Sequence, residues 1–373
     1  MPSPTQPALL IKLRPTGPWR IGPDSGARDR VDRIYHSDTL YSAVTSAMAQ
    51  FDLRDEWLWT TAAAERAPAV RFTSCFPFQG DTLFVPPPRH MWPPVAASRL
   101  RFKSTRFVPI EVVRSLVEEK PLAEDRWIID PASECLLRAD RASQGGPFRV
   151  TVRTSASVDR LTHGAVEVHS VAVLEFGERA GLWTLAAFRD NDARRRWKAP
   201  IQAAFRLLAD SGFGGERSLG FGHCQMPQFQ DCKLPDVILR QASAESLADA
   251  RGSESIPSHD REGVILEDTE TPDVASPPAS AWWVLSLFSP ASTDEIDWNG
   301  GSYSVVTRGG RIESSAQWGA QKRLVRMIAE GSVLRSPSAP TGAAPNVAPD
   351  DFPHPVFRSG HAVSIAIPWR VNL

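Results

Sequence analysis

The stretch Gly212-Phe213-Gly214-Gly215-Glu216-Arg217-Ser218-Leu219-Gly220-Phe221-Gly222 is the most informative part of this chain, because five of its eleven residues are glycine. Residues 198–210 before it have the apolar spacing of a helix, and residues 223–229 after it have the pattern of a short strand. Glycine allows positive φ angles and close approach of a ligand, and backbone N–H groups in such a loop can hold phosphate. Arg217 and Ser218 add a guanidinium and a hydroxyl, which are good phosphate donors. The stretch therefore favours a phosphate-binding loop; the competing interpretation is a flexible connection between helix and strand.

This glycine-rich stretch does not fit the two common nucleotide-binding motifs. A Walker loop has the pattern G-x-x-x-x-G-K-[ST] and opens a helix, whereas here the helix comes first. A dinucleotide fingerprint follows a strand, and no predicted strand leads into this stretch. We therefore expect no cofactor. The candidate ligand-binding residues of the stretch are Gly212, Gly214, Gly215, Arg217, Ser218, Gly220, Phe221 and Gly222.

The first part of the chain predicts a strand, a helix and two more strands. Ala8–Leu13 (ALLIKL) is apolar for most of its length, as in a strand buried on both faces. A helix begins at Ser37, where Ser37 or Asp38 can cap it, and apolar residues follow at helical spacing. Residues 70–85 then predict two strands joined by a turn at Gly80.

Two further elements lead up to the glycine-rich stretch. Residues 170–188 predict a hairpin that turns at residues 178–181. The helix over 198–210 has Pro200 in its first turn and ends at Gly212. Strand, helix, strands, helix and strand in this order are typical of a ferredoxin-like domain with a split β-α-β arrangement. We therefore expect an α+β fold.

The rest of the chain predicts an acidic segment and a second, smaller domain. Residues 241–280 contain nine acidic and two basic residues, so the segment has a net charge of −7 and the rest of the chain +6. We expect a linker or disordered insert there, because so polar a segment cannot bury a core. Beyond it, strands are predicted at 282–288, 303–308 and 361–367, with a helix near 321–329. The expected division is 1–230 for the N-terminal domain, 231–280 for the acidic insert and 281–373 for the C-terminal domain.

The composition argues against several protein classes. A hydrophobic fraction of 42% and a charged fraction of 23% are typical of a globular protein. No apolar run approaches the roughly 18 residues that cross a membrane, and the start of the chain lacks the features of a signal peptide. We therefore expect a cytoplasmic protein without a membrane partner. Four widely spaced cysteines form no C-x-x-C pair, so neither a metal site nor a disulfide framework is indicated.

Four short motifs resemble those of the RAMP superfamily of CRISPR proteins. The pattern G-F-G-G-x-R-S-x-G-F-G at residues 212–222 is similar to the glycine-rich loop of the superfamily. Residues 17–22 (GPWRIG) resemble the turn after its first strand. Residues 36–43 (HSDTLYSA) and 354–360 (HPVFRSG) resemble segments of one member family, the Cas-five-like fourth subunits of type III-A Csm complexes. The resemblance spans residues 8–368, although each motif is short.

The resemblance implies two ferredoxin-like (RRM-like) domains with a glycine-rich loop and inserted hairpin or loop regions. It implies a subunit without catalytic activity that holds the 5′ repeat-derived handle of the CRISPR RNA in an antiviral ribonucleoprotein. The implied partners are that RNA, the large polymerase/HD subunit and the backbone filament subunit, with target RNA nearby. The sequence departs from the family at Glu216, which stands at the variable loop position without a positive charge, and in the acidic segment 241–280.

Five residues outside the glycine-rich stretch are further candidates for RNA contact. His36 and Ser37 belong to the motif that resembles the start of the family's first helix. Arg153 and Arg160 lie in a segment whose counterpart in relatives runs near the RNA. Lys198 follows three arginines at the start of a predicted helix, where cations oppose the helix dipole and a polyanion would relieve them. Each has a plainer interpretation: His36 packs or hydrogen-bonds at the helix start, and the cations are solvated.

Two other functions stay open. The first is a RAMP endoribonuclease that trims precursor CRISPR RNA, with His36 as a base or with His163 and His169 as a pair. Nothing in the sequence brings these histidines together, so no catalytic residue is expected. The second is a protein-interaction scaffold without RNA contact. Metal-independent cleavage of repeat RNA would identify the first, and a salt-dependent gel shift would exclude the second.

Overall fold

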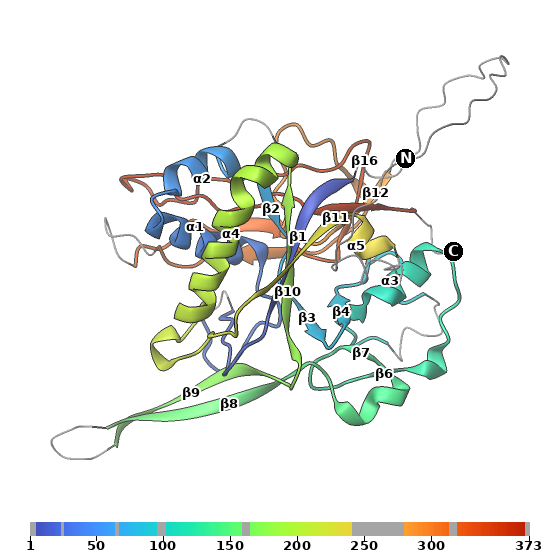
Figure 1. Cartoon of the computed structure of the whole chain (residues 1–373), viewed down its shortest axis with the longest axis horizontal. Helices are drawn as coiled ribbons and strands as arrows, with labels where there is room; N and C mark the ends of the chain where they lie inside the picture. The colour runs from blue at the N-terminus through green and yellow to red at the C-terminus, as the bar shows by residue number, and fades with distance from the viewer. Residues whose placement is uncertain are drawn as a thin grey trace, which may run out of the picture.

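The computed structural model describes residues 5–23, 26–63, 67–94, 102–158, 165–240, 280–312 and 319–369. Helices and strands are mixed along the chain, which confirms the expected α+β class (Figure 1). One antiparallel sheet of seven strands forms the centre, and a second sheet of four strands is built from C-terminal residues. The acidic segment predicted at 241–280 falls, except for its last residue, outside the described ranges.

The large sheet is ordered β11-β1-β10-β3-β4-β5, and β2 also pairs with β10. Its strands are β1 (Gln6–Leu13), β2 (Val70–Phe72), β3 (Phe76–Gln79), β4 (Thr82–Val85), β5 (Val108–Pro109), β10 (Ala180–Phe188) and β11 (Gln228–Leu234). All nine residues of β10 are buried, and β1 lies beside it, which explains why both strands are apolar runs in the sequence. The predicted first strand and the two strands around Gly80 are confirmed, whereas the strand predicted at 223–229 begins only at Gln228.

Helices α1 (Ser37–Gln50), α2 (Arg54–Thr61) and α4 (Asn191–Ser211) gather on one side of this sheet (Figure 1). The predicted start of α1 is confirmed, but its N-cap position is His36, and no side chain caps the helix. The buried face of α1 includes Leu40, Val44 and Met48, at the helical spacing read from the sequence. This helix therefore forms because its apolar stripe packs against α4 and the sheet.

The start predicted for α4 is wrong by seven residues. The helix begins at Asn191, where the carboxylate of Asp190 accepts a hydrogen bond from the N–H of Ala193 at 2.7 Å. This aspartate is the N-cap that the sequence analysis overlooked. Pro200 consequently lies inside the helix rather than in its first turn.

The hairpin predicted at 170–188 is also wrong. Strand β9 (Ala165–Phe176) pairs with β8 (Phe148–Val158), and the two form a long ribbon that projects from the body (Figure 1). Strand β10 instead joins the large sheet beside β1, β2 and β3. The sequence suggested a hairpin because two apolar runs flank a short turn, but their partners lie elsewhere in the chain.

Short elements fill the region between β4 and β8 and the end of the first half. They are β5, α3 (Ile110–Val117), β6 (Trp127–Ile129), β7 (Leu136–Arg138), 3-10 turns at Glu124–Arg126 and Ala139–Gln144, and α5 (Asp236–Leu239). The Arg114 guanidinium of α3 donates to the carbonyls of Val237 and Ile238 at 3.2 and 2.6 Å, so α3 and α5 are held together. A further 3-10 turn, Arg217–Leu219, lies in the glycine-rich stretch.

The C-terminal residues form two sheets. Strands β12 (Ser280–Val284), β13 (Asp297–Ser302), β16 (Val333–Ser336) and β17 (Ser364–Ile367) are ordered β13-β16-β12-β17, and β14 (Val305–Arg308) pairs with β15 (Val325–Ile328). The helix predicted near 321–329 is therefore wrong. Its apolar residues fit a helical or a strand period equally, and pairing with β14 selects the strand. Residues 280–312 and 319–369 contain no helix.

The two halves of the chain share one main hydrophobic core. Trp183 of β10 and Trp283 of β12 are both fully buried and belong to the same cluster. The N–H of Ser74 donates to the carbonyl of Leu285 at 2.9 Å, so main-chain hydrogen bonds also cross between the halves. Within the described ranges, no helix has both the length and the apolar character needed to cross a membrane.

Candidate nucleic-acid interface

The glycine-rich stretch forms a closed loop at the end of α4. Gly212 has a φ of 75° and ends the helix, as predicted. Phe213 is buried, and its ring contacts the rings of Trp19 and Tyr35 at centroid distances of 4.6 and 5.4 Å. The N–H of Phe213 faces the carbonyl of Gly222 at 3.4 Å, which joins the two ends of the loop. An aromatic anchor thus fixes the loop on the body of the protein.

Two of the glycines are required by the packing of the loop itself. Gly214 has a φ of 98°, and a Cβ there would lie 2.7 Å from the carbonyl oxygen of Arg20. Gly222 has a φ of 80°, and a Cβ there would collide with the carbonyl of Phe213. At both positions the chain itself fills the space that a ligand was expected to use. Gly220, also at a φ of 80°, faces open space instead.

The backbone N–H groups at the tip of the loop donate largely within the loop. The N–H of Leu219 donates to the carbonyl of Glu216 at 3.0 Å, and that of Gly220 donates to the carbonyl of Arg217 at 2.9 Å. These two groups are therefore not directed at solvent as an anion nest would require. The side chains of Arg217 and Ser218 are exposed, so the polar groups presented at the tip are side chains.

A strand-like segment containing Trp19 and Arg20 connects the loop to the β8–β9 ribbon. The N–H of Gly215 donates to the carbonyl of Arg20 at 2.9 Å. On the other side, Trp19 exchanges two main-chain hydrogen bonds with Leu174 of β9, at 2.9 and 2.8 Å. The Arg20 guanidinium is buried and donates to the carbonyl of Ala172 at 2.9 Å. Main-chain hydrogen bonds therefore link the loop, this segment and the ribbon into one connected unit.

Arg153, predicted to contact RNA, lies on this ribbon beside a second arginine. Arg149 Nε and Nη2 lie 3.1 and 3.0 Å from one oxygen of Glu175, and Arg153 Nε lies 3.0 Å from the other. The two arginine side chains are 69% and 56% exposed, so both remain accessible to a ligand. Arg160, the other arginine predicted here, lies outside the described residues.

The position of Lys198 in its helix and the charges around it differ from those that were predicted. It lies inside α4 rather than before it, and its Nζ is 2.5 Å from a carboxylate oxygen of Asp231. Arg194 reaches the same carboxylate at 3.0 Å, and Arg196 pairs with Glu56. Three acids thus balance most of the charge of Lys198 and the three arginines before it, so the start of the helix does not by itself require a polyanion, and the RNA contact of Lys198 stays a prediction.

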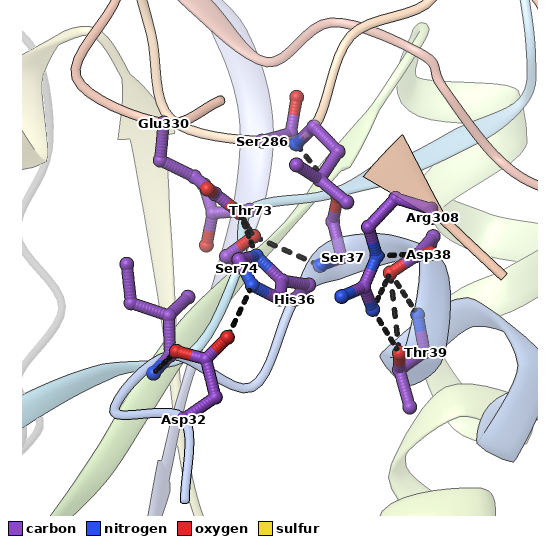
Figure 2. Close-up of polar contacts among 12 residues, drawn as sticks. Asp32, His36, Ser37, Asp38, Thr39, Thr73, Ser74, Ser286, Arg308 and Glu330 are labelled. Atoms are coloured by element: carbon purple, nitrogen blue, oxygen red, sulfur yellow. Dashed lines mark hydrogen bonds and ion pairs between the residues drawn. The ribbon is translucent and has the colours of Figure 1, made fainter. Parts of the chain in front are cut away.

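His36, also predicted to contact RNA, is buried at the start of α1 between two carboxylates (Figure 2). Its Nδ1 lies 2.7 Å from Glu330 Oε1, and its Nε2 lies 3.0 Å from Asp32 Oδ2. Burial alone would lower the pKa of His36, but the Glu330 and Asp32 carboxylates raise it to about 10. The imidazole is therefore protonated at neutral pH. Both ring nitrogens are engaged and the side chain is 7% exposed, so the geometry does not favour the RNA contact predicted for His36.

Ser37 and Asp38 bind residues of the C-terminal half (Figure 2). Ser37 Oγ accepts a hydrogen bond from the N–H of Leu287 at 2.9 Å, and the residue is buried, so the geometry does not favour its predicted RNA contact either. Two arginines bind the Asp38 carboxylate: Arg308 through Nε and Nη2, both at 3.1 Å, and Arg358. Burial would raise the pKa of Asp38, but the two arginines hold it well below its usual range. The start of α1 is therefore a junction between the halves.

The sequence analysis missed the partners in this junction. Glu330 and Arg308 lie in segments without a recognisable motif, and Arg358 lies in a matched motif that did not reveal its partner. The only signal was an aspartate at the start of an apolar helix, since a buried charge requires a counter-charge. His169, proposed for the alternative nuclease, lies 3.3 Å from Arg28 Nη1 on the ribbon, and His163 is outside the described residues. In the described part of the chain, no three His, Cys, Asp or Glu side chains are grouped to hold a metal.

Comparisons with known proteins bear on the whole arrangement. Residues 278–367 match the family model described as the CRISPR Csm4 C-terminal domain. A chain in the crystal structure of a Csm1–Csm4 cassette in complex with pppApA has a similar fold, with a TM-score of 0.54 and 14% identity over 98% of this chain and 99% of that chain. A chain of the Csm3–Csm4 subcomplex of the type III-A CRISPR-Cas interference complex has a TM-score of 0.58 and 13% identity, over 96% and 99% of the two chains. No curated protein sequence matches the chain. At these identities the structural likeness concerns the fold.

Proposed function

We propose that this chain, which is Csm4-like in its fold and in its C-terminal segment, is an RNA-binding subunit of a cytoplasmic type III-A CRISPR complex. In this proposal it holds the 5′ repeat-derived handle of the guide RNA. The observation that carries the proposal is that two different comparisons agree: a Csm4 family model covers residues 278–367, and Csm4-containing structures match the fold over nearly the whole chain.

The strand orders support two ferredoxin-like units. In the large sheet, β11-β1-β10-β3 places the fourth, first, third and second strands of such a unit side by side, with α1 after β1 and α4 after β10. The C-terminal sheet repeats this order as β17-β12-β16-β13. There, the described connections are loops and the β14–β15 pair instead of helices. This repetition favours the proposed division into domains at 1–230 and 281–373, joined by the acidic segment.

RNA binding by this chain is supported by the surface that runs from the loop to the ribbon. Arg217 and Ser218 at the tip of the loop, and Arg149 and Arg153 on the ribbon, are exposed. Arginine pairs with phosphate through two parallel hydrogen bonds, and phosphate contacts position a protein on a nucleic acid. The main-chain hydrogen bonds through Trp19 and Arg20 hold the two parts at a fixed spacing, as a binding surface for an extended strand requires.

A role without catalysis is favoured over the ribonuclease alternative by the state of His36. A general base must be unprotonated and within reach of the ribose hydroxyl. His36 is buried and its pKa is raised to about 10, so it meets neither condition. We therefore propose that the chain acts by binding and positioning.

The proposed protein partners follow from the solved structures. In the two matched structures, Csm4 forms a cassette with Csm1 and a subcomplex with Csm3. We propose that this chain likewise joins a large polymerase/HD subunit to a backbone filament subunit, with target RNA close by. The shared core of its two halves would hold the two partner surfaces in a constant relation.

The proposal is tested by reconstitution. The purified full chain is mixed with the large subunit and the backbone subunit of a type III-A complex, and with a labelled repeat-derived RNA oligonucleotide. We expect one ribonucleoprotein on size exclusion, and a gel shift with the chain alone that weakens as salt rises. We also expect no cleavage of the repeat RNA without metal.

Each alternative has its own outcome in this experiment. A discrete, metal-independent cleavage product would identify the endoribonuclease. Assembly with both proteins but no RNA shift at any salt concentration would identify a protein scaffold. Failure to bind either protein would refute membership of such a complex.

A further inference from the structure

A hollow of about 590 Å³ lies at the root of the β8–β9 ribbon. One wall is the turn of residues 15–18, and another is the pair Gly145 and Gly146. Arg149 and Arg153 of β8 also line it, together with Glu175 of β9. The turn leads directly into Trp19 and Arg20, which join the ribbon to the glycine-rich loop. The hollow is therefore connected to the loop through this segment, but it is a separate depression.

The two arginines converge on one carboxylate although they stand far apart along their strand. Arg149 lies directly opposite Glu175 in the register of the ribbon, whereas Arg153 lies opposite Val171. Four residues of strand correspond to roughly 13 Å, so the Arg153 side chain must lean back toward the root to reach Glu175. By binding both guanidinium groups, Glu175 keeps them together at the hollow, although their positions on β8 are far apart.

The charge of this cluster is unbalanced. Two guanidinium groups share the one carboxylate of Glu175, which is 18% exposed and whose pKa is lowered by its hydrogen bonds from Arg153 and Arg149. The other acid in the lining, Asp130, accepts hydrogen bonds from the N–H and hydroxyl of Ser133 in its own turn, at 2.8 and 2.6 Å. Each guanidinium has five N–H donors and uses two on Glu175. Three N–H donors on each guanidinium therefore remain for a ligand, and the group of Arg149, Arg153 and Glu175 has a net charge of +1, which Asp130 elsewhere in the lining offsets.

We propose that this hollow binds a phosphate group of single-stranded RNA through Arg149 and Arg153, and that Glu175 occupies the position of that phosphate in the free protein. The inference rests on the proposed RNA-binding function and names a second contact point for the same RNA. Carboxylate and phosphate can both accept two parallel hydrogen bonds from a guanidinium, so Glu175 keeps the two arginines oriented for a phosphate. The negative charge of Glu175 at the same time repels the incoming phosphate. RNA is favoured over an isolated anion because the segment of Trp19 and Arg20 connects the ribbon to the loop that presents Arg217, a third exposed arginine.

The test measures binding of a repeat-derived single-stranded RNA oligonucleotide to the full chain over a series of salt concentrations. We expect Arg149→Ala with Arg153→Ala to weaken binding at least tenfold. The double variant should also flatten the salt dependence by about 0.7, since it removes one phosphate contact and each such contact on a single strand contributes a slope of about 0.7. Thermal melting checks that the variants are folded.

The sharper variant is Glu175→Gln. If Glu175 stands in for phosphate, removing its charge should tighten RNA binding, by about two- to fivefold for a partly exposed pair. If Glu175 served only to hold the two strands of the ribbon together, Glu175→Gln would weaken RNA binding or leave it unchanged. Glu178→Gln is the matched control, because it removes the same charge from an exposed turn residue next to β9. An equal gain in both variants would attribute the effect to net charge and overturn the proposal.

The outcomes separate this inference from the function on which it rests. If Arg217→Ala weakens RNA binding but the Arg149/Arg153 double variant binds like the unmodified chain, the hollow is not a phosphate site and the RNA-binding function stands. If the unmodified chain binds no RNA, alone or in the assembled complex, both proposals are refuted.

Discussion

Asp38 at the start of α1 and Arg308 at the end of β14 form a buried ion pair across 270 positions of sequence, with Arg308 Nε 3.1 Å from Asp38 Oδ2. Arg358 binds the same carboxylate, and all three side chains are less than a tenth exposed. Beside it, His36 and Glu330 make a second buried contact between the halves (Figure 2). The start of the first helix of the N-terminal half is thereby tied to three separate segments of the C-terminal half.

Removing the shared carboxylate should destabilise the whole chain. Asp38→Ala leaves Arg308 and Arg358 buried without their counter-charge, which we expect to lower the free energy of unfolding by about 3–5 kcal/mol. Urea denaturation measures the change. Asp192→Ala is the control, since Asp192 pairs with Arg195 on the surface and its loss should cost less than about 1 kcal/mol. Equal effects of the two substitutions would show that the junction contributes no more than a surface pair.

The stability of the chain should fall in alkaline solution. The pKa of His36 is raised to about 10 by Glu330 and Asp32 against the opposing effect of burial, compared with about 6.5 in an unfolded chain. Because the pKa is raised in the folded chain, the stabilisation that protonated His36 gives to the fold is complete below about pH 6.5 and is lost as pH rises toward 10. Urea midpoints between pH 6 and pH 9.5 should therefore decline. His36→Gln should have a lower midpoint at pH 6 and a flatter profile; a profile unchanged by this substitution would contradict the assignment.

The glycines of the loop should fall into two classes. Gly222→Ala places a methyl group against the Phe213 carbonyl at a positive φ, so we expect it to lower the free energy of unfolding by more than about 1 kcal/mol. Gly215→Ala is the comparison, because its φ is ordinary and the nearest atom to a Cβ there is Cγ of Arg20, at 3.3 Å, which would have to shift by only a few tenths of an ångström. It should stay within about 0.5 kcal/mol of the unmodified chain. Thermal and urea melts of the two variants decide, and a reversed order would mean that the loop packs differently.

Arg217→Ala should weaken RNA binding without affecting the fold. The loss of one charge-assisted phosphate contact predicts roughly tenfold lower affinity for any sequence and a salt slope flatter by about 0.7. Filter binding at several salt concentrations measures both quantities. Arg54→Ala is a suitable control, since Arg54 is an exposed arginine of α2, on another part of the molecule (Figure 1). Unchanged affinity and slope for Arg217→Ala would remove this residue from the RNA surface.

The elements that the sequence predicted correctly are those determined by local patterns. The apolar run of β1, the helical spacing of α1 and the glycine that ends α4 each depend on residues within a few positions. The errors arise where distant pairing decides. Strand β9 was assigned to β10 rather than to β8, and β15 was taken for a helix because its apolar residues suit both periods until β14 pairs with it.

The residues of the candidate site show the same difference between features set by local sequence and features set by distant contacts. The tip of the loop could be predicted because Arg217 and Ser218 are exposed in a recognisable motif. His36 and Ser37 belong to an equally recognisable motif, yet their partners Glu330 and Leu287 lie 294 and 250 positions away. A motif marks residues that matter, but burial decides whether they face a ligand or the other half of the chain. That distinction depends on tertiary contacts, which a single sequence does not contain.

The register of the β8–β9 ribbon limits how its length can change. Arg149 and Arg153 share a face because an even number of positions separates them, and their cross-strand neighbours keep the same parity through to Ala156 and Val168. Lengthening or shortening both strands by two residues would change the length of the ribbon and leave Arg149 and Arg153 on the same face. An odd change between the arginines would turn Arg153 to the opposite face. Natural variation in the length of the β8–β9 ribbon should therefore come in steps of two residues per strand.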